Sequence, residues 1–241
     1  MASQTYALNR MTLPEQVAEK LESMILEDTT KFKGKLPSEQ VLAVTFSVSR
    51  TVIREALVIL RAKGLVVKSN GTCSKIASNP GGNLEEVLQR VVRLRNIQPL
   101  EIYETRLALE GLAIRLAASR RRKEDILQLR KLVDEIEAVK NDMARRTERD
   151  IAFHMKIIEV SGNTLLLMLA GTIFVLLKPL ILNALNLVGT STDALALHTK
   201  LVDAIERGDE DDAQDQILKH LALSMRNFEY SLQVGARRKK A

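Results

Sequence analysis

Apolar residues recur every three or four positions along most of the chain, which is the spacing of amphipathic α-helices. From residue 83 onward the sequence shows no alternating strand pattern. The breaks between helical segments contain turn-forming residues, as at residues 80–82 and 161–163. Seven helices joined by short connections predict an all-α bundle. These helices are predicted over residues 83–95, 99–119, 123–143, 145–160, 164–187, 191–207 and 210–233.

The first part of the chain has a different pattern, with short helices close together. An amphipathic segment begins at Leu13, and two serines, Ser38 and Ser49, stand where helix N-caps are expected. Two short helices separated by a tight turn match a helix-turn-helix motif. The two capped helices are predicted over residues 39–44 and 50–63.

The second capped helix has one apolar and one polar face. Its apolar residues are spaced to pack inward, whereas Arg50, Thr51 and Arg54 cluster in its first turns. Positive and hydroxyl side chains at the start of such a helix are suited to contacts with phosphates and base edges. Taken alone, these residues are equally compatible with a solvated helix face, so the order of the neighbouring elements has to decide.

A short hairpin is predicted directly after this helix. Gly64 ends the helix, and the segments 65–68 and 73–76 flank Asn70-Gly71, a dipeptide typical of tight turns. A hairpin that follows a helix-turn-helix forms the wing of a winged helix-turn-helix domain. The sequence therefore predicts a mostly α protein, with an N-terminal DNA-binding domain and a C-terminal helical bundle.

The charge balance agrees with this division. The chain has 36 Lys and Arg against 30 Asp and Glu, a net charge of +6. Residues 1–78 hold 11 basic and 7 acidic residues, whereas residues 79–236 hold 21 and 23. A basic first unit favours a polyanionic partner such as DNA. The expected division is a DNA-binding domain over 1–78, a linker over 79–82, a helical domain over 83–235 and a basic tail over 236–241.

Composition excludes several other classes of protein. Cys73 is the only cysteine, which rules out an internal disulfide framework and a cysteine-based zinc finger. The aromatic content is 3% with no tryptophan, which disfavours a protein that binds single strands by base stacking. The apolar window 164–185 is interrupted by Lys178 and Pro179 and is predicted to be a core helix. With no signal-peptide core either, we expect a cytoplasmic protein with no membrane partner.

Several of these N-terminal segments, namely 36–39, 48–57, 60–66 and 70–72, together resemble the GntR family of bacterial transcription factors. The resemblance implies a homodimer bound to palindromic operator DNA. Gln40 departs from the family pattern, in which an arginine at this position most often reaches DNA, so the operator sequence stays open. By position, the resemblance assigns DNA contacts to Ser49, Arg50, Thr51, Arg54 and, at the tip of the wing, Gly71.

The three histidines of the chain all fall in the C-terminal half. His154 follows Asp150 by four residues, so both lie on one helix face, and His198 and His220 lie on later helices. A single histidine on an amphipathic helix is usually structural. One carboxylate and three imidazoles, however, suit Zn²⁺, Ni²⁺ or a similar borderline divalent ion.

Most of residues 84–232 resemble the FCD ligand-binding domain of the FadR-like GntR subfamily. In many members of that subfamily, an aspartate and three histidines at the positions of Asp150, His154, His198 and His220 ligate a divalent metal. The resemblance also places Arg106 near the cavity, where its guanidinium would bind the carboxylate of an effector. The motifs that carry the resemblance are Arg106-x-x-x-Glu110, Asp150-x-x-Phe153-His154, Ser161-Gly162-Asn163, His198, Gly208-Asp209 and His220-Leu221.

These features predict a transcription regulator, with repression as the expected direction. Its operator affinity would be controlled by a small carboxylate effector, a hydroxy-acid or sugar-acid, bound beside a divalent metal. Two alternatives stay open: a regulator that responds to the metal itself, and a metal that is only structural. Arg106 has its own alternative role, an ion pair with Glu110. The sequence has no nucleophile elbow, phosphate loop or clear partner base, so no enzyme is expected.

Overall fold

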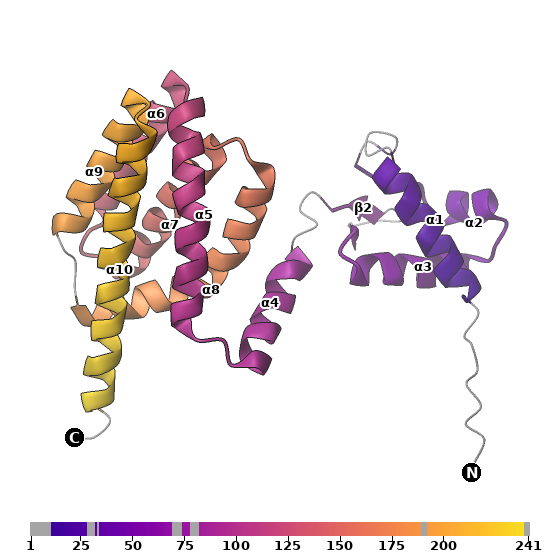
Figure 1. Ribbon diagram of the computed structural model, residues 1–241. Helices are drawn as coiled ribbons and strands as arrows, with labels where there is room; N and C mark the ends of the chain where they lie inside the picture. Colours follow the sequence, from indigo (N-terminus) through magenta and orange to yellow (C-terminus); the bar gives the residue numbers. More distant parts are fainter. Residues whose placement is uncertain are drawn as a thin grey trace, which may run out of the picture. The chain divides into compact units, whose positions relative to one another are not determined.

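A computed structural model describes residues 11–27, 32, 34–68, 74–77, 82–188 and 192–238. The chain divides into two compact units, residues 1–87 and 88–241, and each is considered separately. Nearly all of the described elements are helices (Figure 1), as the sequence pattern predicts. The expected linker, the Asn70-Gly71 turn with its wing-tip glycine, Cys73 and the end of the basic tail lie outside the described residues, apart from Gly82.

The first unit is a winged helix-turn-helix. Both capping serines act as predicted: each hydroxyl accepts the backbone N–H three residues later, at 3.3 Å. Between α2 and α3 the chain turns at Ser47, whose φ of 54° is left-handed. The elements are α1 (Leu13–Glu27), α2 (Glu39–Phe46), α3 (Arg50–Ala62), β1 (Val66–Lys68) and β2 (Ser74–Ile76).

A small apolar core fixes α3 in this unit. Leu21 of α1 and Ile53 and Leu60 of α3 are fully buried and belong to the same core cluster. β1 and β2 pair antiparallel, with Val66 opposite Ile76, and Lys35 adds a bridge to Lys75. The apolar face of α3 therefore packs inward and leaves its basic first turns outside.

The second unit is a helical bundle. Within it α5 and α10 run side by side, and α5 also packs against α7, α8 and α9 (Figure 1). The helices are α5 (Pro99–Arg120), α6 (Lys123–Ala138), α7 (Met143–Val160), α8 (Thr164–Val188), α9 (Thr192–Arg207) and α10 (Glu210–Arg238). A further helix, α4 (Gly82–Arg95), crosses the division between the two units. All seven predicted helices form, and α5 to α10 pack against one another as a bundle.

Two glycines and two polar caps set several connections of the bundle. Gly162 and Gly208 have φ of 65° and 74°, the left-handed conformation that favours glycine, and each ends a helix. Asn163 caps α8 through its Oδ1, which accepts the N–H of Leu166 at 3.1 Å. The helix predicted over 123–143 ends earlier, at Ala138, because Asp142 caps the next helix instead.

One helix, α8, is long and apolar enough to cross a membrane by length and composition alone. In this chain it packs against α5, α7 and α10, and Leu177 on its inner side is fully buried. Only a third of its apolar window is buried, because its outer side exposes Leu165, Met168 and Leu169. The helix contributes to the core, as predicted, and also presents an apolar outer face.

Candidate functional site

The recognition helix α3 presents its polar face at its N-terminal end. The side chains of Arg50 and Arg54 are 57% and 60% exposed, and Thr51 is exposed beside them. Glu39 of α2 lies between the two arginines, with its Oε2 2.8 Å from Nε of Arg54 and 3.9 Å from Nη2 of Arg50. Exposed pairs of this kind contribute little stability, so a phosphate can replace the carboxylate.

Ser49 has a structural task as well as its predicted DNA contact. Its hydroxyl accepts the N–H of Val52 and so caps α3. Sequence reasoning missed the acidic partner Glu39, because a pair between two helices leaves no periodic signal within either one.

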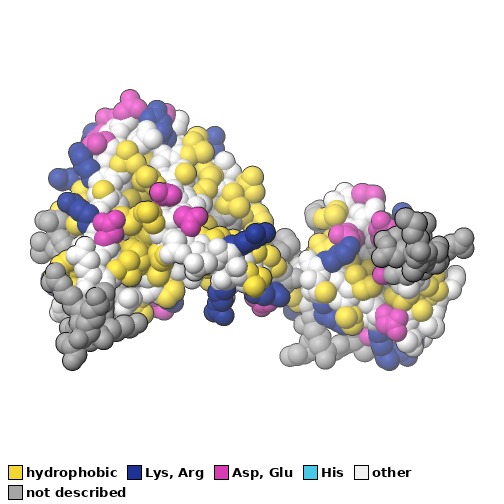
Figure 2. Space-filling view, turned by 60° about the horizontal axis from the view of Figure 1, so that its bottom comes forward, with side chains coloured by type: hydrophobic (Ala, Val, Ile, Leu, Met, Phe, Trp, Pro, Cys, Tyr) yellow, Lys and Arg dark blue, Asp and Glu magenta, His cyan; other side chains and the backbone are white. Residues whose placement is uncertain are grey.

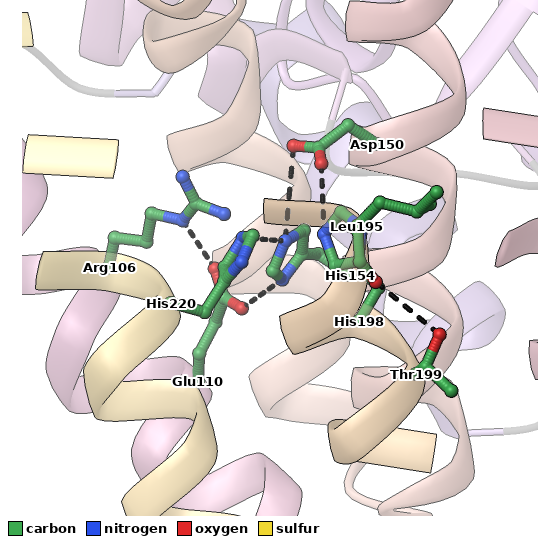
Figure 3. Close-up of polar contacts among 8 residues, drawn as sticks. All are labelled: Arg106, Glu110, Asp150, His154, Leu195, His198, Thr199 and His220. Atoms are coloured by element: carbon green, nitrogen blue, oxygen red, sulfur yellow. Dashed lines mark hydrogen bonds and ion pairs between the residues drawn. The ribbon is translucent and has the colours of Figure 1, made fainter. Parts of the chain in front are cut away.

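The second unit brings the four predicted metal ligands together. Asp150 and His154 come from α7, His198 from α9 and His220 from α10 (Figure 3). One ligand atom from each residue lies within 4.8 Å of all the others. The three histidines are buried, and Asp150 is 15% exposed at its side chain.

The imidazole nitrogens meet without normal hydrogen-bond partners. Nε2 of His154 lies 3.1 Å from Nε2 of His220, and Nε2 of His198 lies 3.2 Å from Oδ1 of Asp150. Despite this approach, neither nitrogen of His198 forms a hydrogen bond of normal geometry with a described residue, and the same is true of Nδ1 of His220. Nitrogen lone pairs that converge in a dry site, beside one carboxylate, are the donors that a borderline divalent cation prefers.

The electrostatics keep these ligands ready for a cation. Burial lowers the pKa of His198 and, together with the neighbouring histidines, holds the pKa of His220 well below its ordinary value. For Asp150, burial acts in the opposite direction, but the contact with His198 and the histidine charges keep the pKa of its carboxyl far below its usual range. At neutral pH these directions favour neutral imidazoles at His198 and His220 and an ionised carboxylate at Asp150.

Glu110 of α5 connects Arg106 to the histidine cluster. Its Oε1 accepts a hydrogen bond from Nε of Arg106 at 2.5 Å, and its Oε2 lies 2.5 Å from Nδ1 of His154 (Figure 3). Burial raises the pKa of Glu110, but the charges of Arg106 and His154 outweigh that effect and lower it. This contact orients His154 so that Nε2 points into the cluster, the usual task of a carboxylate behind a metal-binding histidine.

Arg106 makes the ion pair with Glu110 and still has free donors. Its side chain is 1% exposed, and its Cζ lies 5.2 Å from the ring centroid of Phe174. Both Nη atoms are buried and have no hydrogen-bond partner among the residues that the structure describes. Leaving the donors of a buried charged group without acceptors costs free energy. The Nη atoms of Arg106 are therefore suited to bind an acceptor that a ligand supplies.

A cavity of about 50 Å³ adjoins the cluster. Asp150 and His220 form part of its wall, and Arg146 adds a guanidinium group. Sequence reasoning missed Arg146 and the polar residues of α10 in this wall. Their spacing was the available signal, because Arg146 precedes Asp150 by one helical turn and so shares its face. The other lining residues are Ile181, Leu185, Ala194, Leu223, Ser224 and Asn227.

A winged helix-turn-helix with exposed arginines, together with a helical unit that buries a cluster of possible metal ligands, is typical of a DNA-binding transcription regulator. The sequence model described as "Bacterial regulatory proteins, gntR family" matches residues 13–76, and the model of the FCD domain matches residues 101–223. The chain belongs to the GntR family and carries an FCD domain. It is a transcription regulator rather than an enzyme.

Two transcription regulators and a solved GntR structure are similar to this chain over most of its length. The chain is 29% identical over 220 residues to the HTH-type transcriptional repressor NanR of Cronobacter sakazakii, covering 89% of this chain and 84% of that protein. It is 28% identical to the Glc operon transcriptional activator of Escherichia coli, over 65% of this chain and 64% of that one. Among solved structures, Streptococcus agalactiae GntR matches with 26% identity and a TM-score of 0.69, over 88% of this chain and 99% of that chain.

Proposed function

We propose that this regulator represses transcription as a cytoplasmic homodimer on a palindromic operator, and that a small carboxylate effector releases it. The effector, a hydroxy-acid or sugar-acid, would bind beside a divalent metal held by Asp150, His154, His198 and His220. The observation that carries this proposal is the pair of unpartnered, buried Nη atoms of Arg106 next to the metal-ligand cluster. Repression is favoured by the similarity to NanR, which is named a repressor.

The metal, zinc or nickel, would supply a Lewis-acidic centre that accepts oxygen ligands. The chain's own residues supply the rest of the effector site. Arg106 binds a carboxylate through its two free Nη donors, and Glu110 fixes both that guanidinium and the ring of His154. Effector binding shifts operator affinity only if the effector prefers one arrangement of the protein over the other.

The dimer is supported by exposed apolar side chains on the second unit. On α8, Leu165, Met168 and Leu169 are 64%, 42% and 40% exposed and follow one another at helical spacing. Hydrophobic side chains also gather on the face of this unit shown in Figure 2. Apolar patches of this kind mark protein contact surfaces, and a second copy of the chain is the partner that a palindromic operator requires.

We expect the Arg106→Ala variant to bind operator normally but to release it poorly. Loss of charge-assisted hydrogen bonds to the effector, worth about 1.5–3 kcal/mol, should raise the required acid concentration by roughly 10- to 100-fold. The measurement is fluorescence-detected operator binding, with hydroxy- and sugar-acids added to the metal-loaded protein. Arg115→Ala, on the same helix and bonded to α10 rather than to the cluster, is the control.

If the Arg106→Ala variant releases operator DNA at the same acid concentration as wild type, Arg106 does not bind the effector carboxylate. The alternative function, a response to the metal alone, is motivated by a ligand cluster that is complete without any organic group. It predicts that operator affinity follows the metal concentration and ignores every acid in the panel.

For DNA binding, we propose contacts from Ser49, Arg50, Thr51, Arg54 and Gly71. Replacement of Arg50 or Arg54 by Ala should weaken operator binding by about 1–3 kcal/mol if a bidentate base contact is lost. Anisotropy titrations at one salt concentration measure this, with Lys20→Ala as a control that removes one exposed charge from α1.

A matched variant tests the role of Glu39. Because Glu39 competes with DNA for Arg50 and Arg54, Glu39→Gln should not weaken binding at all. Wild-type affinity in both arginine variants would show that another element reads the operator.

A further inference from the structure

A second buried arginine lies beside the metal-ligand cluster. Arg146 of α7 stands one helical turn before Asp150, and 5% of its surface is exposed. Its guanidinium makes no hydrogen bond or ion pair with any residue that the structure describes, whereas Arg106 is bonded to Glu110. Asp150 and Glu137 act on Arg146 through their charges, without a direct bond. Burying a cation without a directly bonded acceptor is costly. Arg146 therefore has no directly bonded acceptor among the described residues.

The surroundings of Arg146 are built to receive a small polar group. The cavity that it lines is also lined by Asp150 and His220, and by Ser224 and Asn227 of α10. Ser224 and Asn227 follow His220 by four and seven residues, so the three side chains share one face of α10. The rest of the wall is aliphatic. The cavity thus places one guanidinium, one hydroxyl and one amide beside the carboxylate of Asp150 and the imidazole of His220, which would bind the proposed metal.

The size of the cavity sets the size of its occupant. Its volume is about 50 Å³. One water needs about 10–15 Å³ by this kind of measure, so the cavity has room for about three to five atoms of that size. A carboxylate has three heavy atoms. A single carboxylate group therefore fits, whereas a whole sugar ring does not.

Charge points to the same kind of occupant. The buried guanidinium groups of Arg106 and Arg146 contribute two positive charges, which the carboxylates of Glu110 and Asp150 balance. A bound divalent cation leaves this buried group with a net charge of +2. Two negative charges from a ligand would restore neutrality in a site that water barely reaches.

We propose that Arg146, Ser224 and Asn227 form a second acid-binding subsite, and that the effector is a small dicarboxylic acid. One carboxylate of this effector binds at Arg106, and the other binds in the cavity at Arg146. The inference rests on the proposed effector function and narrows the effector class from carboxylates in general to dianions.

The test compares acids that differ only at one end. Metal-loaded protein is titrated calorimetrically with succinate and butyrate, and with malonate and propionate, and zinc content is measured after each titration. In the wild type, at least one diacid should bind about tenfold or more tightly than its matching monoacid. The Arg146→Met variant should lose this preference, and Arg145→Met, which changes the exposed neighbour on the same helix, should retain it.

A second readout guards against a folding defect. Because the buried guanidinium of Arg146 has no directly bonded acceptor among the described residues, Arg146→Met should raise the melting temperature of the ligand-free, metal-loaded protein relative to wild type. Arg146→Lys keeps the buried charge but loses the planar pair of donors, and it should show a reduced diacid preference.

Two results would overturn the subsite. The first is an unchanged diacid preference in Arg146→Met and Arg146→Lys, and the second is equal binding of both acids of each pair by the wild type. Both leave the proposed effector function standing, because acids still bind. If no acid of either charge binds the metal-loaded wild type, the effector function and the subsite both fail.

Discussion

Replacing Glu110 by Ala should destabilise the protein by about 3–5 kcal/mol, the usual cost of removing one partner of a buried ion pair. The reason lies in the two groups that Glu110 serves at once. Without it, the guanidinium of Arg106 loses its only hydrogen bond to the described chain, and Nδ1 of His154 loses its acceptor. Urea unfolding of the metal-free protein, followed by far-ultraviolet circular dichroism, measures the change.

Two further variants separate charge from packing. Glu104→Ala removes an exposed carboxylate from the same helix and should cost less than about 0.5 kcal/mol. The double variant with Glu110→Ala and Arg106→Met removes both charges and should recover much of the lost stability, since no uncompensated guanidinium remains. If Glu110→Ala costs no more than Glu104→Ala, the buried pair does not stabilise the fold.

The helices and their caps could be predicted because their signals are local. Ser38, Ser49 and Asn163 cap helices from positions that their own sequence neighbours reveal. The helix predicted over 123–143 was too long because Asp142 starts a new helix, and its capping bond competes with continued helix. Each of these outcomes depends on fewer than about five consecutive residues.

The candidate site was only partly predictable, because burial depends on distant helices. The sequence pattern with the family resemblance selected the four possible metal ligands, and the fold brings their ligand atoms within 4.8 Å of one another. The sequence alone could not show that the pair of Arg106 and Glu110 is buried, because an i,i+4 pair has the same spacing on any helix face. That difference decides its energy, since an exposed pair contributes almost nothing.

Arg146 illustrates the same limit in a different way. Arg145, Arg146 and Arg149 are all on α7, and only Arg146 is buried. Helical spacing from Asp150 would have selected it, because a residue four positions earlier lies on the same face. The cavity that makes this position meaningful is formed by residues of α8, α9 and α10, which no local pattern relates to α7.

Metal loading should raise the free energy of unfolding by about 4 kcal/mol when free zinc exceeds its dissociation constant a thousandfold. The gain arises because the folded chain alone presents the four ligand atoms together. His198→Ala should abolish the gain, and Thr199→Ala, an exposed neighbour on α9, should retain it. Thermal unfolding with and without a chelator, together with elemental analysis, measures the effect. Wild-type protein that takes up neither zinc nor nickel would refute the metal site.

Acidification should remove the metal-dependent gain, and the direction follows from the histidines. The pKa values of His198 and His220 are lowered in the folded chain from an ordinary value of 6.5. The unfolded chain therefore binds protons first as the pH falls below about 6.5, which stabilises it relative to the folded protein. Protons also compete with zinc for the same ring nitrogens. The zinc-dependent shift in melting temperature should shrink between pH 7 and about pH 5, and it should persist unchanged only if the histidines are not the ligands.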